Sequence, residues 1–233
     1  YGTWDDHDYG YDNAGRDYHF KKESKEEFLR FLDFPENDPI RKKRGIYYSK
    51  FIQYQNLNIH LIFLDLRSFK SKSELLGKDQ WSWLDRELRK NGNDLTIVVS
   101  SLNVLSDHHP IFYYIEGWHK YKKERNKLFK LVSEFQGQLI FFSGDRHFSD
   151  RSMRIIPGGK VVYEFMSSGI TKTSTFYRMN RYRIGDYVKA RNFSTLEISK
   201  NEELNRLKLE HRILSSETGE TLSEYLLGFN LSN

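Results

Sequence analysis

Residues 139–147 read Leu-Ile-Phe-Phe-Ser-Gly-Asp-Arg-His, a short apolar run that passes directly into a glycine-led polar turn. The same pattern occurs twice earlier in the chain. The apolar run 59–64 leads into Asp65-Leu66-Arg67, and the run 95–99 leads into Ser100-Ser101-Leu102-Asn103. In open α/β architectures ligands bind beyond the carboxyl ends of the strands. The repeated pattern therefore predicts one rim on which polar and ionisable side chains collect.

Amphipathic helices alternate with these strands and complete the pattern of a layered α/β fold. In residues 78–89, Trp81, Leu84 and Leu88 recur at helical spacing and Asn91-Gly92-Asn93 ends the helix. A second helix is predicted over about 116–135, and Pro157-Gly158-Gly159 is typical of a hairpin turn. Strands are predicted at 46–54, 57–66, 95–100, 138–142, 153–156, 161–165, 188–198, 206–215 and 225–230.

The composition is that of a globular chain. With 233 residues and 38% hydrophobic content, the chain can bury one sizeable core, which predicts a single domain over 1–233. No apolar stretch approaches the roughly 20 residues of a membrane span, so we expect a soluble protein. The net charge of +5 suits anionic substrates, although a solvated surface is the favoured explanation. The absence of cysteine leaves metal binding to carboxylate, imidazole and amide groups.

Two short segments carry the candidate chemistry. Trp4-Asp5-Asp6-His7-Asp8 places three carboxylates within four residues, and their mutual repulsion indicates either a bound cation or an exposed acidic turn. Asp145 and His147 lie two residues apart on a glycine-led turn, a donor pair that suits hard or borderline metals. We expect the two segments to meet around a cation.

Five blocks occur in a fixed order along the chain. They are Gly2-Thr3-Trp4-Asp5-Asp6-His7-Asp8-Tyr9-Gly10, Arg44-Gly45-Ile46-Tyr47-Tyr48-Ser49, Leu64-Asp65-Leu66-Arg67, Leu76-Gly77-Lys78-Asp79-Gln80-Trp81-Ser82-Trp83-Leu84 and Ser143-Gly144-Asp145-Arg146-His147-Phe148. In order and spacing these blocks resemble the PhoD-like alkaline phosphatases, a branch of the calcineurin-like metallophosphoesterases. The resemblance runs from Tyr1 to about Ile198 and includes Glu116, Trp118 and Arg125 on the long helix.

The resemblance implies an α/β/β/α sandwich of two mixed sheets flanked by helices, incomplete at the amino terminus. Residues 1–233 would be the carboxy-terminal portion of one metallophosphatase domain. It also implies two metal ions, Ca²⁺ and/or Fe³⁺, with Mn²⁺ or Zn²⁺ as alternatives, and hydrolysis of phosphate monoesters or diesters by metal-bound hydroxide. Because the family's first metal-ligand motifs lie upstream, the isolated fragment is expected to be inactive or impaired. Relatives are often exported, which implies an extracytoplasmic or secreted location; no signal sequence is present in this chain.

The resemblance also implies roles for individual residues. His7 and Asp8 correspond to the catalytic imidazole and the acid that orients it. Asp6, Asp145 and His147 correspond to metal-binding residues. The family has Asn-Asp where this chain has Asp12-Asn13, so a carboxylate at Asp12 would replace an amide ligand. Arg67 and Asn103, which stands where Gln is expected, lie on the predicted rim as substrate-binding candidates, with a structural salt bridge as the alternative for Arg67.

A second hypothesis is a non-catalytic relative that binds nucleic acid or another polyanion. Tyr177-Arg178 and Arg181-Tyr182-Arg183 interleave basic and aromatic side chains, although the segment is predicted to be a loop rather than a sheet face. Under the first hypothesis the partner is a phosphate ester, nucleic acid enters only as a substrate, and the oligomeric state is open. For His108-His109-Pro110 a loop is favoured over a metal site, since neighbours on an extended segment point to opposite sides.

Overall fold

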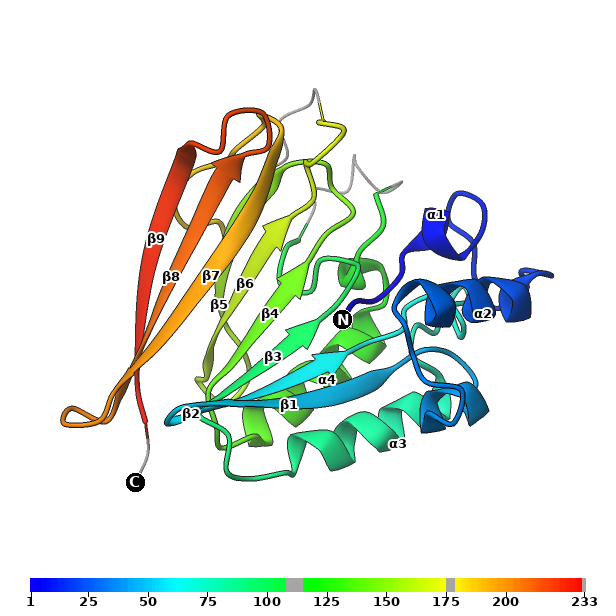
Figure 1. Cartoon of the computed structure of the whole chain (residues 1–233), viewed down its shortest axis with the longest axis horizontal. Coiled ribbons are helices and arrows are strands. Elements are labelled where there is room, and N and C mark those ends of the chain that lie inside the picture. Colours follow the sequence, from blue (N-terminus) through cyan, green and yellow to red (C-terminus); the bar gives the residue numbers. More distant parts are fainter. Residues whose placement is uncertain (108–114, 175–178, 232–233) are drawn as a thin grey trace.

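The computed structural model describes residues 1–107, 115–174 and 179–231. Two sheets pack face to face, with helices on the far side of the larger sheet and at the amino-terminal end (Figure 1). The larger sheet has the strand order β1-β2-β3-β4-β6-β5, and the smaller has the order β7-β8-β9. The strands are β1 (Tyr48–Tyr54), β2 (Leu57–Phe63), β3 (Leu95–Val99), β4 (Leu139–Ser143), β5 (Ser149–Ile155), β6 (Val161–Ser167), β7 (Asn192–Asn201), β8 (Arg206–Ser215) and β9 (Thr221–Asn230).

The centre of the larger sheet is parallel. β2, β3, β4 and β6 pair in parallel, with Ile62 opposite Val98 and Val98 opposite Phe141. β1 and β5 add antiparallel edges through the hairpins that the sequence predicts. Because β2, β3 and β4 run in the same direction, the segments that follow them emerge at one end of the sheet, as predicted from the repeated pattern.

Two helices cover one face of the larger sheet. α3 (Gly77–Leu88) and α4 (Lys122–Glu134) contribute Trp81 and Phe129 to a core that also contains Ile62, Val98 and Phe141. A short 3₁₀ turn, η3 (Trp118–Lys120), precedes α4. The helices are amphipathic because their apolar residues recur every three or four positions and face the sheet.

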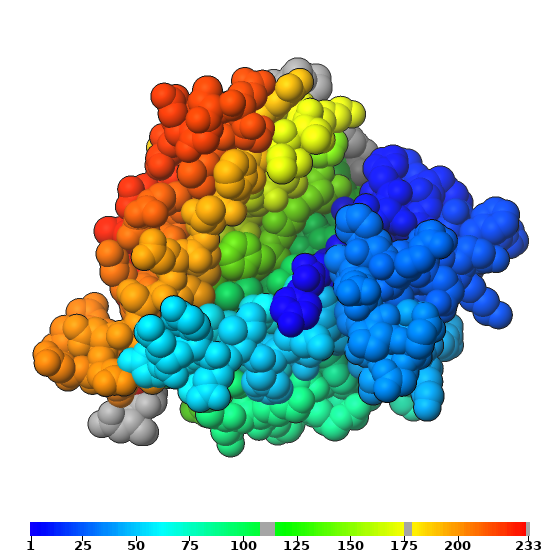
Figure 2. All heavy atoms as spheres, viewed as in Figure 1, coloured from blue at the N-terminus to red at the C-terminus, as the bar shows by residue number. Residues whose placement is uncertain are grey.

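The smaller sheet packs against the opposite face. Leu207, Leu209 and Leu227 lie in one core with Leu95 and Ile140 of the larger sheet. Figure 2 shows that this cover is partial: the surface is hollowed between the orange small sheet and the blue amino-terminal segment, with the green strands of the larger sheet at its floor.

The amino-terminal segment has a core of its own. α1 (Asp6–Tyr9), α2 (Lys21–Phe31) and the 3₁₀ turn η1 (Pro39–Lys42) enclose an apolar cluster around Trp4, Leu29 and Ile46. Asp65, which is wholly buried after β2, accepts hydrogen bonds from Trp4 Nε1 at 2.9 Å and from the amide of Ile46 at 2.8 Å. This one carboxylate therefore fastens the amino-terminal segment to the end of β2.

The predicted α/β sandwich is confirmed, with several differences in detail. The smaller sheet is antiparallel rather than mixed, and within the described ranges no helix lies on its outer face (Figure 1). α4 begins at Lys122 rather than near 116, β7 begins at Asn192 rather than 188, and α1 and α2 were not predicted. None of the helices in the described part of the chain has both the length and the apolar character needed to cross a membrane.

Candidate metal centre

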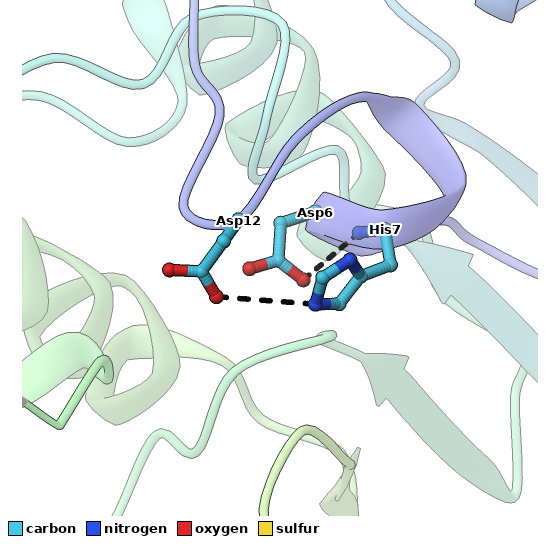
Figure 3. A group of neighbouring side chains, drawn as sticks. All are labelled: Asp6, His7 and Asp12. Atoms are coloured by element: carbon cyan, nitrogen blue, oxygen red, sulfur yellow. Dashed lines mark hydrogen bonds and ion pairs between the residues drawn. The ribbon is translucent and has the colours of Figure 1, made fainter.

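The acidic turn at the start of the chain brings three potential metal ligands together. One ligand atom each from Asp6, His7 and Asp12 lies within 4.8 Å of the others. Figure 3 shows the three side chains pointing toward one another, Asp6 and His7 from α1 and Asp12 from the loop that follows. Carboxylate oxygens with one imidazole nitrogen form a donor set that fits a hard or borderline cation. The predicted metal ligands Asp6 and Asp12 are therefore neighbours.

Asp6 is a buried carboxylate that backbone amides hold in place. Its oxygens accept hydrogen bonds from the amides of His7 at 2.9 Å and Asn13 at 2.8 Å, and Arg67 lies 3.9 Å away. Burial acts to raise the pKa of Asp6, but the hydrogen bond from Asn13 and the charge of Arg67 outweigh it and hold the pKa below its ordinary value. Asp6 is thus an ionised, oriented carboxylate, which is the form that binds metals.

The imidazole of His7 is exposed, and its nearest acidic partner is Asp12. His7 Nε2 lies 3.8 Å from Asp12 Oδ1. Asp8, expected to orient this imidazole, accepts instead a hydrogen bond from the amide of Asp5 at 3.0 Å and so caps α1. The predicted orienting role of Asp8 stays a prediction, while the geometry places Asp12 in the better position for it.

A pocket of about 260 Å³ separates the acidic turn from the glycine-led turn after β4. Asp5 and Asp8 lie on one side of it, and Gly144 and Asp145 lie on the other. The two segments that were expected to meet do so here, and Asp5 and Asp145 are among the residues that line the pocket between them.

Two of the carboxylates that line this pocket, Asp5 and Asp145, repel each other. Burial raises the pKa of Asp5 to about 7, and the charge of Asp145 adds to the increase, which Arg67 only partly offsets. Burial likewise raises the pKa of Asp145, although Arg146 lies 3.2 Å from its carboxylate. A cation in the pocket would relieve both effects, because it would replace the missing solvation of two negative groups.

Arg67 connects the pocket to a buried ion-pair chain. Its Nε donates to Asp5 at 2.7 Å, and its NH1 lies 2.8 Å from Glu116. Glu116 also pairs with Lys70 at 2.6 Å, and Lys70 donates to the carbonyl of Asn13 at 2.5 Å. The guanidinium is wholly buried and engaged on both sides. The geometry therefore favours the structural salt bridge over the substrate clamp, the two alternatives that the sequence left open.

The turn after β4 has a strained backbone. Asp145 and His147 have φ values of 72° and 58°, in the left-handed region that non-glycine residues rarely adopt. The amide of His147 donates to Ser168 Oγ at 2.8 Å, which helps to hold this conformation. Strained residues of this kind cluster at functional sites. Among the described contacts, the imidazole of His147 does not join the Asp6–His7–Asp12 group.

Asn103 lies on the predicted rim but is buried and engaged. Its Nδ2 donates to Ser143 Oγ at 3.0 Å, and its carbonyl accepts from the amide of Trp118 at 3.0 Å. Beside it, the buried Glu164 accepts from the amides of Val104 and Leu105 at 2.7 and 2.8 Å. Asn103 therefore braces the loop after β3, and its predicted contact with substrate stays a prediction.

Sequence reasoning missed Asp5. It belongs to the acidic run that was singled out, but the family correspondence starts at Asp6. The signal that could have identified it is the pair formed with Arg67, since a buried arginine near the end of β2 requires an acidic partner. Glu116 was noted only as part of the family pattern, and Lys70 was not noted.

The arginines on which the polyanion-binding hypothesis rests already pair with acidic residues, where the structure describes them. Arg181 donates to Asp107 at 2.7 Å, and Arg183 donates to Asp150 at 2.8 Å. Tyr177-Arg178 and His108-His109-Pro110 lie outside the described residues. Trp81, Trp83 and Trp118 are buried.

Comparisons with known proteins give one family match and two solved structures of similar fold. The family model described as PhoD-like phosphatase matches residues 1–216. A solved structure of PhoD is similar over 98% of this chain and 52% of its own, with a TM-score of 0.65 and 13% identity. The purple acid phosphatase PPD1 from seeds of yellow lupin (Lupinus luteus) is similar over 94% of this chain and 39% of its own, with a TM-score of 0.62 and 13% identity.

The chain thus spans about half the length of the solved PhoD structure. A search of curated protein sequences gives no match. At such low identity the two solved structures support the fold alone.

Proposed function

Because the chain belongs to the PhoD-like phosphatase family, with a match over residues 1–216, we propose that it carries part of a two-metal centre that hydrolyses phosphate monoesters or diesters. The observation that supports the proposal most is the grouping of Asp6, His7 and Asp12 beside the pocket that holds Asp5 and Asp145. This grouping lies at the end of the parallel strands, where α/β folds bind ligands.

We assign the ligands from the geometry and from the family. Asp6 and Asp12 would hold one ion, and Asp145, with Asp5 opposite, would hold a second; His147 stays a ligand candidate by family resemblance. The oxygen-rich donor set suits Ca²⁺ and Fe³⁺, while the imidazoles also suit Mn²⁺ or Zn²⁺. Bound ions would neutralise the phosphoryl oxygens and make a water molecule a stronger nucleophile at neutral pH.

The side chains of the chain itself would position and protonate the substrate. His7 is exposed and its ring can reach a leaving oxygen, to which it would donate a proton, while Asp12 would orient the ring. Asp8 would accept the hydrogen bond from the amide of Asp5 that caps α1, and so help to hold Asp5 in the pocket. Arg67 would orient Asp5 and partly offset the effect of burial on its pKa rather than contact the substrate.

The experiment is a hydrolysis assay on the full-length protein with p-nitrophenyl phosphate and bis-p-nitrophenyl phosphate. Metal-free protein is reconstituted with Ca²⁺, Fe³⁺, Mn²⁺ or Zn²⁺. We expect metal-dependent turnover that falls by about 100-fold or more in His7→Ala, in line with the loss of a general acid. His19→Ala, which removes another exposed histidine from the same segment, is the matched control. Turnover that is equal in wild type and His7→Ala contradicts the proposal.

A further inference from the structure

A second pocket, separate from the metal centre, is lined mainly by cationic residues. It has a volume of about 340 Å³ and lies between α2 and the segment that contains η1, the blue elements at the right of Figure 1. Glu26 is its one acidic lining residue, and it shares no lining residue with the Asp5–Asp145 pocket. The six cationic residues that line it are Lys21, Lys22, Lys25, Arg41, Lys43 and Arg44.

The first wall is the beginning of α2, where cations are unfavourable. Lys21 and Lys22 occupy the first turn beside one acidic residue, Glu23, and Phe20 at the N-cap supplies no side-chain hydrogen bond to the free amides. The partial positive charge of a helix amino terminus repels cations and attracts anions. Residues that oppose the local electrostatic preference are expected where function requires them. A bound anion would offset this repulsion, because both lysines and the helix terminus would attract its negative charge.

The second wall is held in place by Lys25. Its Nζ donates to the carbonyls of Ile40, Arg41 and Lys43 at 2.9, 3.0 and 2.6 Å. Burial lowers the pKa of Lys25, and the charge of Arg41 contributes to the decrease. These bonds fix the backbone of 40–43 against α2, so the pocket is formed before any ligand arrives.

Four of the six cations already have partners in the fold. Lys21, Lys25 and Lys43 donate to backbone carbonyls, and Arg41 pairs with Glu26 and Glu36. Arg41 lies 2.8 Å from Glu26, which is exposed. Within residues 1–107, 115–174 and 179–231, neither Lys22 nor Arg44 forms an ion pair; Arg44 lies over the ring of Phe69 at 5.6 Å. Both side chains are exposed and can therefore turn toward a ligand. A ligand that pairs with both of them, inside a pocket that four further cations line, needs several negative charges within a small volume.

We propose that this pocket is an anion-binding site for a compact diphosphate group, separate from the metal centre. The group supplies several acceptor oxygens for Lys21, Lys22 and Arg44 and for the free amides at the start of α2. Its source is either inorganic pyrophosphate or the diphosphate of a nucleotide, because both present the same chemistry to the pocket.

The test is isothermal titration of metal-free full-length protein with pyrophosphate and, in a second arm, with ADP. Removing the metal prevents binding at the metal centre. We expect binding of at least one ligand, and the arm with higher affinity identifies the source. The double variant Lys22→Glu/Arg44→Glu should weaken binding by at least about tenfold, equivalent to about 1.4 kcal/mol.

The matched control is Lys123→Glu/Lys130→Glu, which makes the same change in net charge at exposed positions of α4. It should bind as the wild type does. Absence of binding in both arms, or an equal loss in the two double variants, overturns the proposal, since an equal loss indicates only nonspecific attraction. Thermal unfolding of each variant checks that the fold is kept. His7→Ala should bind normally, so failure here and failure of the proposed hydrolysis are separable.

Discussion

The buried guanidinium of Arg67 donates from Nε to the carboxylate of Asp5 at 2.7 Å. These residues are 62 positions apart in the sequence, and their contact joins the acidic turn to the segment after β2. Glu116 pairs with the other side of the guanidinium and also with Lys70. The carboxylate of Asp5 is therefore positioned by a chain of ion pairs that ends at Lys70. The geometry of the centre therefore depends on residues that do not contact a metal.

Replacing Arg67 by methionine should destabilise the protein strongly. The change leaves Asp5 and Glu116 without their shared cation, and breaking a buried pair costs about 3–5 kcal/mol. Urea unfolding measures the change. Arg89→Met is the matched control, because Arg89 pairs with Asp85 at 2.8 Å on the exposed face of α3 and its removal should have little effect. Equal destabilisation by the two substitutions would contradict the prediction.

Glu116→Gln should impair turnover more than substrate binding. The neutral side chain of glutamine pairs poorly with both Arg67 and Lys70. Lys70 then holds the carbonyl of Asn13 less firmly, and the backbone amide of Asn13, which donates to Asp6, is less well positioned. We expect kcat to fall by about tenfold, equivalent to about 1.4 kcal/mol, with KM changed little. Steady-state kinetics at saturating metal separates the two constants. Glu134→Gln, at an exposed position of α4, should match the wild type, and Glu116→Asp should recover part of the loss.

Gly45→Ala should cost more stability than Gly92→Ala. Both glycines have strongly positive φ, 89° and 88°, so alanine is strained at either position, by about 1–3 kcal/mol. At Gly45 a methyl group would also collide with Asp65 Oδ2, whereas at Gly92 it meets no atom within 4 Å. The free energy of unfolding of the two variants isolates the steric effect. An equal cost at the two positions would argue against the packing around Asp65.

Acidification should destabilise the core between the sheets through His211. Burial lowers the pKa of this imidazole to about 3, and the charge of Arg151, which donates to His211 Nδ1 at 2.9 Å, contributes. The unfolded chain binds the proton near pH 6.5, so the stabilisation is complete above that pH and decreases as the pH falls toward 3. Between pH 7 and 5 the loss should be about 2 kcal/mol.

The variant His211→Asn keeps an acceptor for Arg151 and does not titrate. Urea unfolding as a function of pH should therefore give a flatter profile for this variant over the same range. A profile as steep as that of the wild type would assign the acid sensitivity to other groups.

Metal removal should lower the melting temperature. A metal at 100 times its dissociation constant stabilises the folded state by about 2.7 kcal/mol. Thermal unfolding with and without chelator measures this difference. Asp12→Ala should reduce it, because it removes one member of the Asp6–His7–Asp12 group, whereas Asp17→Ala, which removes an exposed carboxylate nearby, should not. A melting temperature indifferent to chelation would count against the centre.

The periodicity of the sequence predicts the larger sheet well because its strands are buried on both faces. Runs such as 95–99 and 139–142 are apolar throughout, and their parallel pairing follows from the helices between them. β8 was predicted with the bounds that are observed, since its residues alternate between buried and exposed. The helices α1 and α2 were missed because α1 is a single turn and α2 is rich in lysine with few apolar positions.

The candidate site was predicted in its segments but not in its contacts. Local charge density identified the acidic turn, and the glycine-led turn followed a recognisable strand. Which carboxylate faces which cannot be obtained from spacing, because Asp5 is turned toward the pocket by Arg67 and Asp6 is turned away by the amides of His7 and Asn13. Those partners are distant in sequence or belong to the backbone.

Asp65 sets a limit on how the sequence can vary. Its carboxylate accepts four hydrogen bonds, from Trp4 Nε1, from the amide of Ile46 and from the amides of Arg67 and Ser68. Asparagine has the same shape, but whichever way its amide turned, an NH₂ group would face a backbone donor. No uncharged residue of the same shape can therefore replace Asp65 without losing hydrogen bonds. We expect the surrounding loops to vary in sequence more readily than this one acid.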